Sequence, residues 1–236
     1  MKLFNLDNPF MQALGKMADL LLLNMLTLLC CIPIITVGAS LTALHYMALK
    51  MARNEECYIA RGFFKSFKQN FRQATLIWLL MLFMIVVLVM DFLIMNNSGA
   101  EFNGVIRVII TLFALFAFCG SIYVFPVLAK FENTIWRTIK NAFLMSIMQL
   151  PKTVLMVILY IFPAVFLVFF FQLAPLAFFF GLSVPAWLSA KLYSKLFKKL
   201  EDQILKQVQP VEEESEDERI FRDELDESLL GDSTNL

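Results

Sequence analysis

Residues 59–74 read IARGFFKSFKQNFRQA, and the rest of the chain is organised around this stretch. Its phenylalanines recur at steps of three and four residues, so they form one apolar stripe on a helix. Its lysines and arginines follow the same steps on another face. A basic, aromatic and amphipathic helix of this kind lies on a membrane surface, docks on a partner protein, or does both.

The composition around this stretch is too apolar for an ordinary soluble protein. Hydrophobic residues make up 59% of the 236 residues, against roughly 45–50% in soluble domains. Charged residues make up only 17%, where about 25% is usual. Long apolar runs in a bilayer form spanning helices. The sequence therefore predicts an all-α, polytopic helical membrane protein whose surroundings are the lipid bilayer.

The zero net charge of the chain hides two parts of opposite sign. Residues 1–206 contain 18 Lys and Arg against 9 Asp and Glu, whereas residues 207–236 contain 2 Arg against 11 acids. The acidic part has few apolar residues and cannot form a core. We therefore expect a helical transmembrane domain over 1–206 and a disordered acidic tail over 207–236.

The N-terminal quarter of the chain leaves two topologies open. Residues 1–18 are mildly amphipathic and predict a short interfacial helix. Residues 19–52 are too long for one upright span, which needs roughly 20 residues, and Pro33 lies near their middle. A hairpin of two helices over 19–32 and 37–52 is favoured. The alternative is one kinked, tilted helix over the same residues.

Residues after Pro33 suggest how the second helix of this hairpin begins and packs. Thr36 is predicted to cap it, and Gly38 and Ala39 permit close helix packing. With the hairpin the chain has about six membrane segments, and with a single helix it has five. The other segments are predicted at 74–95, 105–129, 153–173 and 174–190, the last two separated near Gln172 and Pro175.

A second amphipathic segment lies at residues 130–152. Trp136 and Phe143 belong to its apolar stripe, and Lys140 belongs to its basic residues. Basic residues concentrate here, in 50–72 and in 191–199, whereas the loop at 96–104 has none. The positive-inside rule therefore predicts that both amphipathic helices are cytoplasmic. With the favoured hairpin both chain termini are cytoplasmic, whereas one helix over 19–52 would put the N-terminus outside.

Few residues in the chain are suited to chemistry. His45 is the only histidine, and a hydrogen-bonded packing role is favoured over a proton relay. Asp91 and Arg107 flank the outer loop and either pair or extend toward the membrane surface, the second being favoured.

No catalytic or phosphate-binding motif is present, so neither an enzyme nor a cofactor is predicted. The basic residues need no nucleic acid, since anionic lipid explains them. Four cysteines, Cys30, Cys31, Cys57 and Cys119, lack metal spacing and are expected to be reduced.

Several motifs stand out along the chain. They include Asn24, the unit P-x-x-T-x-G-A that begins at Pro33, the Thr42–Ala43 pair, and F-F-x-x-F-x-x-N-F-x-Q-A ending at Ala74. Together they resemble the YesL-like family of bacterial membrane proteins. YVFPVLAKFENT, KNAF and LPKT in the second half are also similar, and the resemblance covers about residues 5–199. It implies a bacterial cell-membrane location and an association with carbohydrate uptake, without established catalytic or ligand residues.

The function expected from this resemblance is that of an accessory component of an ABC-type sugar importer. The two amphipathic helices would then dock on its permease or its ATPase. The alternatives are a transport subunit itself, or a structural or regulatory membrane protein. The predicted docking residues are Phe63, Phe64, Lys65, Phe67, Lys68, Phe71, Arg72, Trp136, Lys140 and Phe143.

Overall fold

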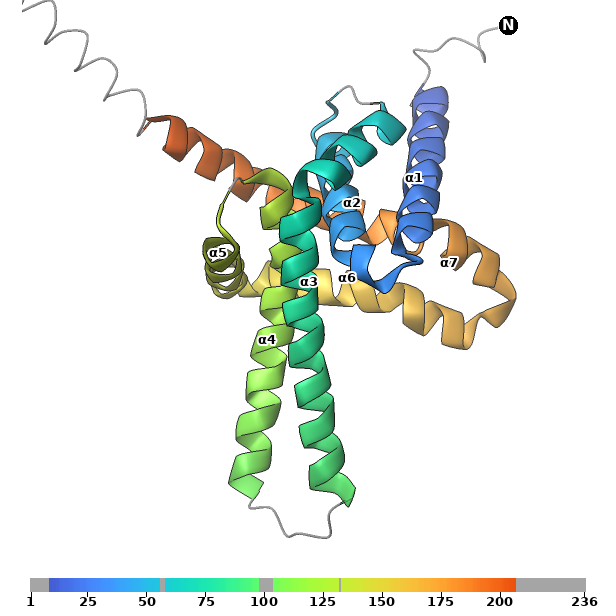
Figure 1. Ribbon diagram of the computed structural model, residues 1–236. Helices are drawn as coiled ribbons and strands as arrows, with labels where there is room; N and C mark the ends of the chain where they lie inside the picture. Colours follow the sequence, from blue (N-terminus) through green and yellow to red (C-terminus); the bar gives the residue numbers. More distant parts are fainter. Residues whose placement is uncertain (1–8, 56–57, 98–103, 132, 207–236) are drawn as a thin grey trace, which may run out of the picture. The chain divides into compact units, whose positions relative to one another are not determined.

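The structure is a computed structural model that describes residues 9–55, 58–97, 104–131 and 133–206. All regular secondary structure in these ranges is helical (Figure 1). The chain divides into two compact units, Met1–Leu192 and Tyr193–Leu236. The acidic tail at 207–236 lies outside the described residues. The predicted all-α class is confirmed.

The first two helices form the favoured hairpin. Helix α1 covers Pro9–Cys31, a 3-10 turn η1 covers Ile34–Thr36, and α2 covers Val37–Ala52. Pro33 has no backbone donor and disfavours helix before it, so the chain reverses there. Figure 1 shows α2 returning beside α1. The separate short helix expected within 1–18 is wrong from Pro9 on, because nothing interrupts α1 between Pro9 and Cys31.

Helix α3 joins two elements that the sequence suggested separately. It covers Ile59–Asn97 in 39 residues, so the basic stretch and the following apolar span are one continuous helix. Neither Pro nor Gly occurs after Gly62 within α3, so nothing in the backbone ends the helix between the two parts. The basic residues are therefore fixed to a membrane span.

Three helices follow α3 in the larger unit. Helix α4 covers Gly104–Lys130, α5 covers Ile135–Met148 and α6 covers Leu150–Phe169. The predicted span at 105–129 and the second amphipathic helix are confirmed as α4 and α5. Pro151 lies in the first turn of α6. Backbone N–H groups in a first turn have no partner within the helix, so the N–H that proline lacks is not needed there.

The last apolar segment contains an additional break. A 3-10 turn η2 covers Phe171–Leu173 and α7 covers Ala174–Phe180, which confirms the predicted separation near Gln172. The next helix, Ser183–Lys206, makes an angle of 54° with the preceding helical segment, Phe171–Phe180. The α-helix is therefore interrupted after Phe180, within the segment predicted over 174–190. Within the second unit, the rings of Tyr193 and Phe197 pack with their centroids 4.7 Å apart and their planes tilted by 40°.

The core of the larger unit is centred on α2, and 11 of its 16 residues are buried. Small residues let α3 approach α2 closely. A Cβ atom added at Gly38 would lie 2.6 Å from Trp78 Cβ and would also collide with the Ala74 carbonyl oxygen. The close packing predicted at Gly38 is therefore confirmed.

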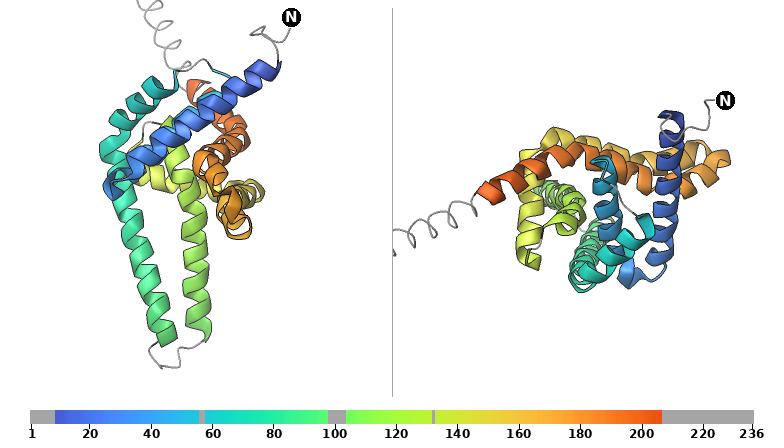
Figure 2. Two further views of the ribbon diagram at one scale, coloured as in Figure 1. Left: turned by 90° about the vertical axis from the view of Figure 1, so that its right-hand side faces the viewer. Right: turned by 90° about the horizontal axis from the view of Figure 1, so that it is seen from above.

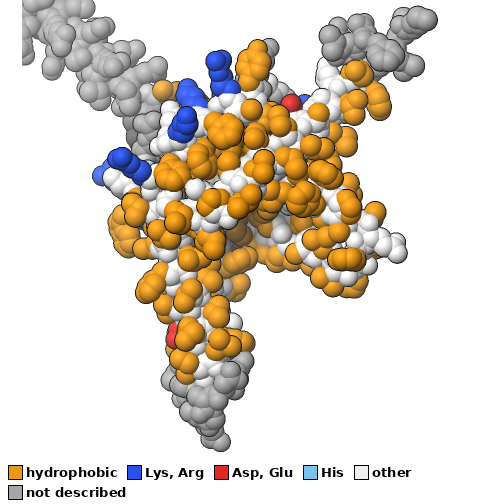
Figure 3. Space-filling model, turned by 45° about the vertical axis from the view of Figure 1, so that its right-hand side comes forward, with side chains coloured by type: hydrophobic (Ala, Val, Ile, Leu, Met, Phe, Trp, Pro, Cys, Tyr) orange, Lys and Arg blue, Asp and Glu red, His pale blue; other side chains and the backbone are white. Residues whose placement is uncertain are grey.

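The outer helices carry the apolar surface that a bilayer requires. In the described part of the chain, five helices are long and apolar enough to cross a membrane, and a bent pair, Phe171–Phe180 with Ser183–Lys206, raises this to six. Helices α3 and α4 run side by side. The C-terminal half of α3 and the N-terminal half of α4 extend beyond α1 and α2, which do not cover them (Figures 1 and 2). Apolar side chains dominate the surface of this pair (Figure 3). These helices indicate a multi-pass membrane protein.

Candidate functional site

The first half of α3 presents a stripe of four basic side chains. Arg61, Lys65, Lys68 and Arg72 follow one another at steps of four, three and four residues, and all four are exposed. Among the described residues, an ion pair joins Arg53 to Glu55 at 4.0 Å, and it does not involve these four side chains. We call these four residues the basic stripe. Lys and Arg side chains gather at one end of the face that Figure 3 shows.

The opposite face of the same helix is built into the core. Phe63 is fully buried, whereas Phe64 is 43% exposed. Phe67 and Phe71 are half-buried, and their ring centroids lie 5.6 Å apart. Phe63 must therefore be removed from the predicted docking residues, because its face of α3 packs inward beside Gly62, which adjoins the Met47 side chain of α2.

Helix α5 is held against the base of α3 and against α4. The Gln73 side chain donates a hydrogen bond to the Asn133 carbonyl oxygen at 2.6 Å, just before α5. The Phe143 ring lies against Gly120 of α4, where an added Cβ would be 2.6 Å from Phe143 Cδ1. Trp136 is 76% exposed and Lys140 is exposed. The structure thus brings the two predicted docking segments together at Gln73 and Asn133.

Asn24 of α1 stabilises the broken helix near the end of the larger unit. Its side chain is fully buried. Its Nδ2 donates to the Phe178 carbonyl oxygen at 2.8 Å, and its Oδ1 accepts from the Leu182 and Ser183 backbone N–H groups at 3.0 Å each. In an unbroken helix the Leu182 N–H would bond to the Phe178 carbonyl. Asn24 bonds to both groups instead, which satisfies the backbone without water.

Sequence reasoning gave Asn24 no role, although it noted the residue as a motif position. The available signal was a polar side chain within an apolar run together with a helix-breaking Gly181. The missing information was that these two places, far apart in the chain, are neighbours in the fold.

The break at Pro33 is satisfied in a similar way by side chains. The Thr36 hydroxyl lies 2.6 Å from the Cys30 carbonyl oxygen and 2.8 Å from that of Pro33. The Trp78 indole N–H donates to the Ile34 carbonyl oxygen at 2.8 Å. Thr36 makes no capping bond to α2. The predicted cap is therefore wrong, because the hydroxyl donates back to the Cys30 carbonyl at the end of α1 and to the Pro33 carbonyl after it.

His45 lies in a buried set of polar side chains that joins three helices. Its Nε2 is 3.3 Å from the Tyr160 hydroxyl of α6, which is 2.9 Å from the Ser189 hydroxyl. Ser189 also donates to the Pro185 carbonyl oxygen at 2.7 Å. The hydrogen-bonded packing role predicted for His45 is confirmed. Sequence reasoning missed Tyr160 as the partner of His45 and Ser189 as the partner of Tyr160.

The other candidates for chemistry are not gathered into a site. No group of three His, Cys, Asp or Glu side chains that would hold a metal ion occurs in the described part of the chain. Cys30, Cys31 and Cys119 are free thiols, and Cys57 lies outside the described residues. Within those residues no ion pair is recorded between Asp91 and Arg107.

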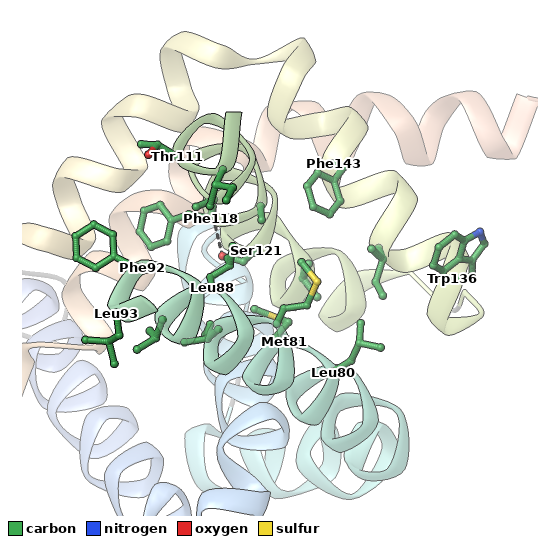
Figure 4. A pocket seen from close by; sticks show the side chains of 18 residues that line it. Leu80, Met81, Leu88, Phe92, Leu93, Thr111, Phe118, Ser121, Trp136 and Phe143 are labelled. Atoms are coloured by element: carbon green, nitrogen blue, oxygen red, sulfur yellow. Dashed lines mark hydrogen bonds between the residues drawn. The ribbon is translucent and has the colours of Figure 1, made fainter. Parts of the chain in front are cut away.

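Several apolar grooves lie on the described part of the larger unit, and two of them border the elements above. The first has a volume of about 590 Å³ and lies between α3, α4 and α5 (Figure 4). The second has a volume of about 390 Å³ and lies beside Asn24, with Leu28 of α1 and Phe178 of α7 among its walls. Neither groove presents a cluster of titratable side chains, so both suit apolar groups.

Comparison with known proteins adds one family match. No curated protein and no solved structure matches the chain. Residues 20–92 contain Asn24, the Pro33 break and the basic stripe. These residues match the family described as "Protein of unknown function, DUF624", the domain that YesL-like proteins carry.

Proposed function

We propose that this chain is a YesL-like protein of the bacterial cell membrane that acts as an accessory component of carbohydrate uptake, and that it docks on an ABC-type sugar importer through the basic stripe. The link to sugar uptake is what the motif resemblance implies, and the family match over residues 20–92 supports the resemblance itself. The exposed stripe, without recorded ion pairs in the described residues, is the observation that supports docking.

The stripe is well suited to a protein contact because it is held rigidly. Phe63 and Ala74 lie on the buried side of the same helix segment, and both are fully buried. The basic side chains therefore project from a backbone that the core fixes, which limits the entropy lost on binding. Four cations on one face suit an acidic surface on the importer, because complementary charge speeds association and selects the partner.

The location of basic residues supports a cytoplasmic contact. The stripe, α5 and the Lys-rich end of the chain would be cytoplasmic under the positive-inside rule. The tip between α3 and α4 would then be external, and both chain termini would be internal. A stripe in the cytoplasm faces the loops of a permease and its ATPase.

Affinity purification of the full chain from native membranes, followed by mass spectrometry, tests this proposal. We expect importer subunits to copurify under mild solubilisation. The triple variant Lys65→Gln/Lys68→Gln/Arg72→Gln should reduce their recovery about tenfold or more, because each lost cation at a complementary surface weakens binding. Phe63 and the core are untouched by these changes.

The matched control is Lys198→Gln/Lys199→Gln, which removes exposed charge from the second unit. It should retain the importer subunits. A cysteine-accessibility assay should determine the membrane topology of every variant. It distinguishes a variant that has inserted in the reverse orientation from one that has lost only the contact with the importer. Recovery of no importer subunit with the unaltered chain, or equal recovery with the triple variant, would contradict the proposal.

A transport subunit is the second candidate, and the placement of α5 favours it. This helix has 14 residues and lies between the spans α4 and α6, separated from them by short connections. Permeases contact their ATPase through short helices between spans. Substrate flux in proteoliposomes that contain only this chain and an ATPase would support transport, and absent flux beside normal importer copurification would favour the accessory role.

A further inference from the structure

The groove between α3, α4 and α5 offers an occupant almost no polar contact. Two hydroxyl groups line it, those of Thr111 and Ser121. Thr111 donates to the Arg107 carbonyl oxygen at 2.8 Å, and Ser121 donates to the Phe118 carbonyl oxygen at 2.6 Å. Both hydroxyl donors are thus used within α4. The part of a ligand that lies in this groove must be apolar.

The groove is long enough for a chain that reaches through one leaflet and too short for one that crosses the whole hydrocarbon core. On α3 its lining extends from Leu80 to Leu93, which at 1.5 Å per residue is roughly 20 Å. The hydrocarbon core is about 30 Å thick, so one leaflet accounts for about half of it. Figure 4 shows Leu80 and Trp136 toward one end, and Phe92, Leu93 and Thr111 toward the other. A complete spanning helix would need a longer contact.

The two ends of the groove differ in charge. At the α5 end, Arg137 and Lys140 are exposed cations with no recorded ion pair in the described residues. The other end carries one charge of each sign, Asp91 and Arg107. An occupant with one anionic end is therefore attracted to α5.

Helix α5 also presents the side chains typical of a headgroup site. Trp136 lines the groove and is 76% exposed, and tryptophan favours the level of lipid headgroups. Lys140 lies one turn after Trp136 and three residues before Phe143, so it flanks the wall of the groove. Its long side chain extends a cation from an apolar surface.

We propose that this groove binds one anionic phospholipid, with an acyl chain along α3 and α4 and the phosphate at Lys140 and the Trp136 indole N–H. Basic side chains between membrane helices bind anionic headgroups in this manner. A neighbouring apolar helix or a second copy of the chain would leave the two cations unused. The site does not depend on the proposed contact with a sugar importer.

Native mass spectrometry of the purified full chain tests the site. The protein is titrated with phosphatidylglycerol and with phosphatidylcholine that carries the same acyl chains. Phosphatidylglycerol should be retained in preference, and Lys140→Gln should weaken its binding about fivefold, as expected for one cation near a lipid headgroup. Lys140→Arg should preserve binding. Lys68→Gln, in the basic stripe, should leave lipid binding unchanged.

A second variant tests the acyl-chain part of the groove. Ala117 lies in its wall, and Ala117→Phe should fill the space and reduce retention of both lipids. Thermal unfolding shows whether this variant is folded. If it is not, the test rests on Lys140→Gln, because Lys140 is exposed and its replacement does not disturb the core. Equal retention of the two lipids, or unchanged binding by Lys140→Gln, would overturn the proposal. Retention of a dimer that Ala117→Phe disrupts would identify a second copy as the occupant.

Discussion

Asn24 and Phe178 are 154 positions apart, yet the Asn24 side-chain amide donates to the Phe178 carbonyl oxygen at 2.8 Å. The same side chain accepts from the Leu182 N–H at 3.0 Å. One amide thus connects two backbone groups that an unbroken helix would have joined directly. The break after α7 therefore depends on a residue of α1.

Replacing Asn24 should reveal this dependence. Asn24→Leu keeps the approximate volume but leaves the Phe178 carbonyl and two N–H groups without their partner. Because unsatisfied buried groups cost about 1–3 kcal/mol each, we expect a loss of about 3 kcal/mol in the free energy of unfolding. Equilibrium unfolding in mixed detergent micelles measures it.

Asn70→Leu provides the matched control for Asn24→Leu. The Asn70 amide donates only to Ser66 of its own helix, at 3.1 Å to the carbonyl oxygen. Its replacement should cost less than about 1 kcal/mol. Equal losses for the two variants would show that Asn24 does not have the special role described.

The contact of α2 with α3 should reject even one methyl group at Gly38. Gly38→Ala would place Cβ 2.6 Å from Trp78 Cβ and against the Ala74 backbone. The helices must then separate, and we expect a loss of about 2 kcal/mol in the free energy of unfolding. Gly15 has no atom within 4 Å of an added Cβ. Gly15→Ala should therefore be neutral, or stabilising by up to about 1 kcal/mol.

The contact of α4 with α5 is testable by a double-mutant cycle. Gly120→Ala would place Cβ 2.6 Å from Phe143 Cδ1, at an expected cost of about 1–3 kcal/mol. Phe143→Leu removes the ring that obstructs the new methyl group. The double variant should therefore be more stable than the sum of the single effects predicts, by about 1 kcal/mol. Additive effects would mean that α5 does not pack on Gly120.

The buried polar set around His45 should respond to loss of one hydroxyl. Tyr160→Phe removes the group that lies 2.9 Å from Ser189 and 3.3 Å from His45. We expect a loss of about 1 kcal/mol in the free energy of unfolding, since hydrogen bonds between membrane helices contribute modestly. Tyr58 is 84% exposed, so Tyr58→Phe should change stability by less than about 0.5 kcal/mol. Identical results for both tyrosines would contradict the assigned role.

Phe63 and Phe64 show how far local pattern reaches. Periodicity places the phenylalanines of residues 59–74 on one broad face, and the structure confirms that this stretch is helical. Within that face, Phe63 is fully buried and Phe64 is 43% exposed. The difference depends on where α2 lies, which is information that the local sequence does not contain.

The sequence by itself determined the helical membrane class, a break at Pro33 and the existence of α5. These follow from local causes: apolar length, the missing proline donor, and residues repeated at helical steps. Tertiary structure alone decided the pairing of Asn24 with the break after α7 and of His45 with Tyr160. Those contacts join distant segments, and hydrogen bonding in an apolar core selects them only after the helices have packed.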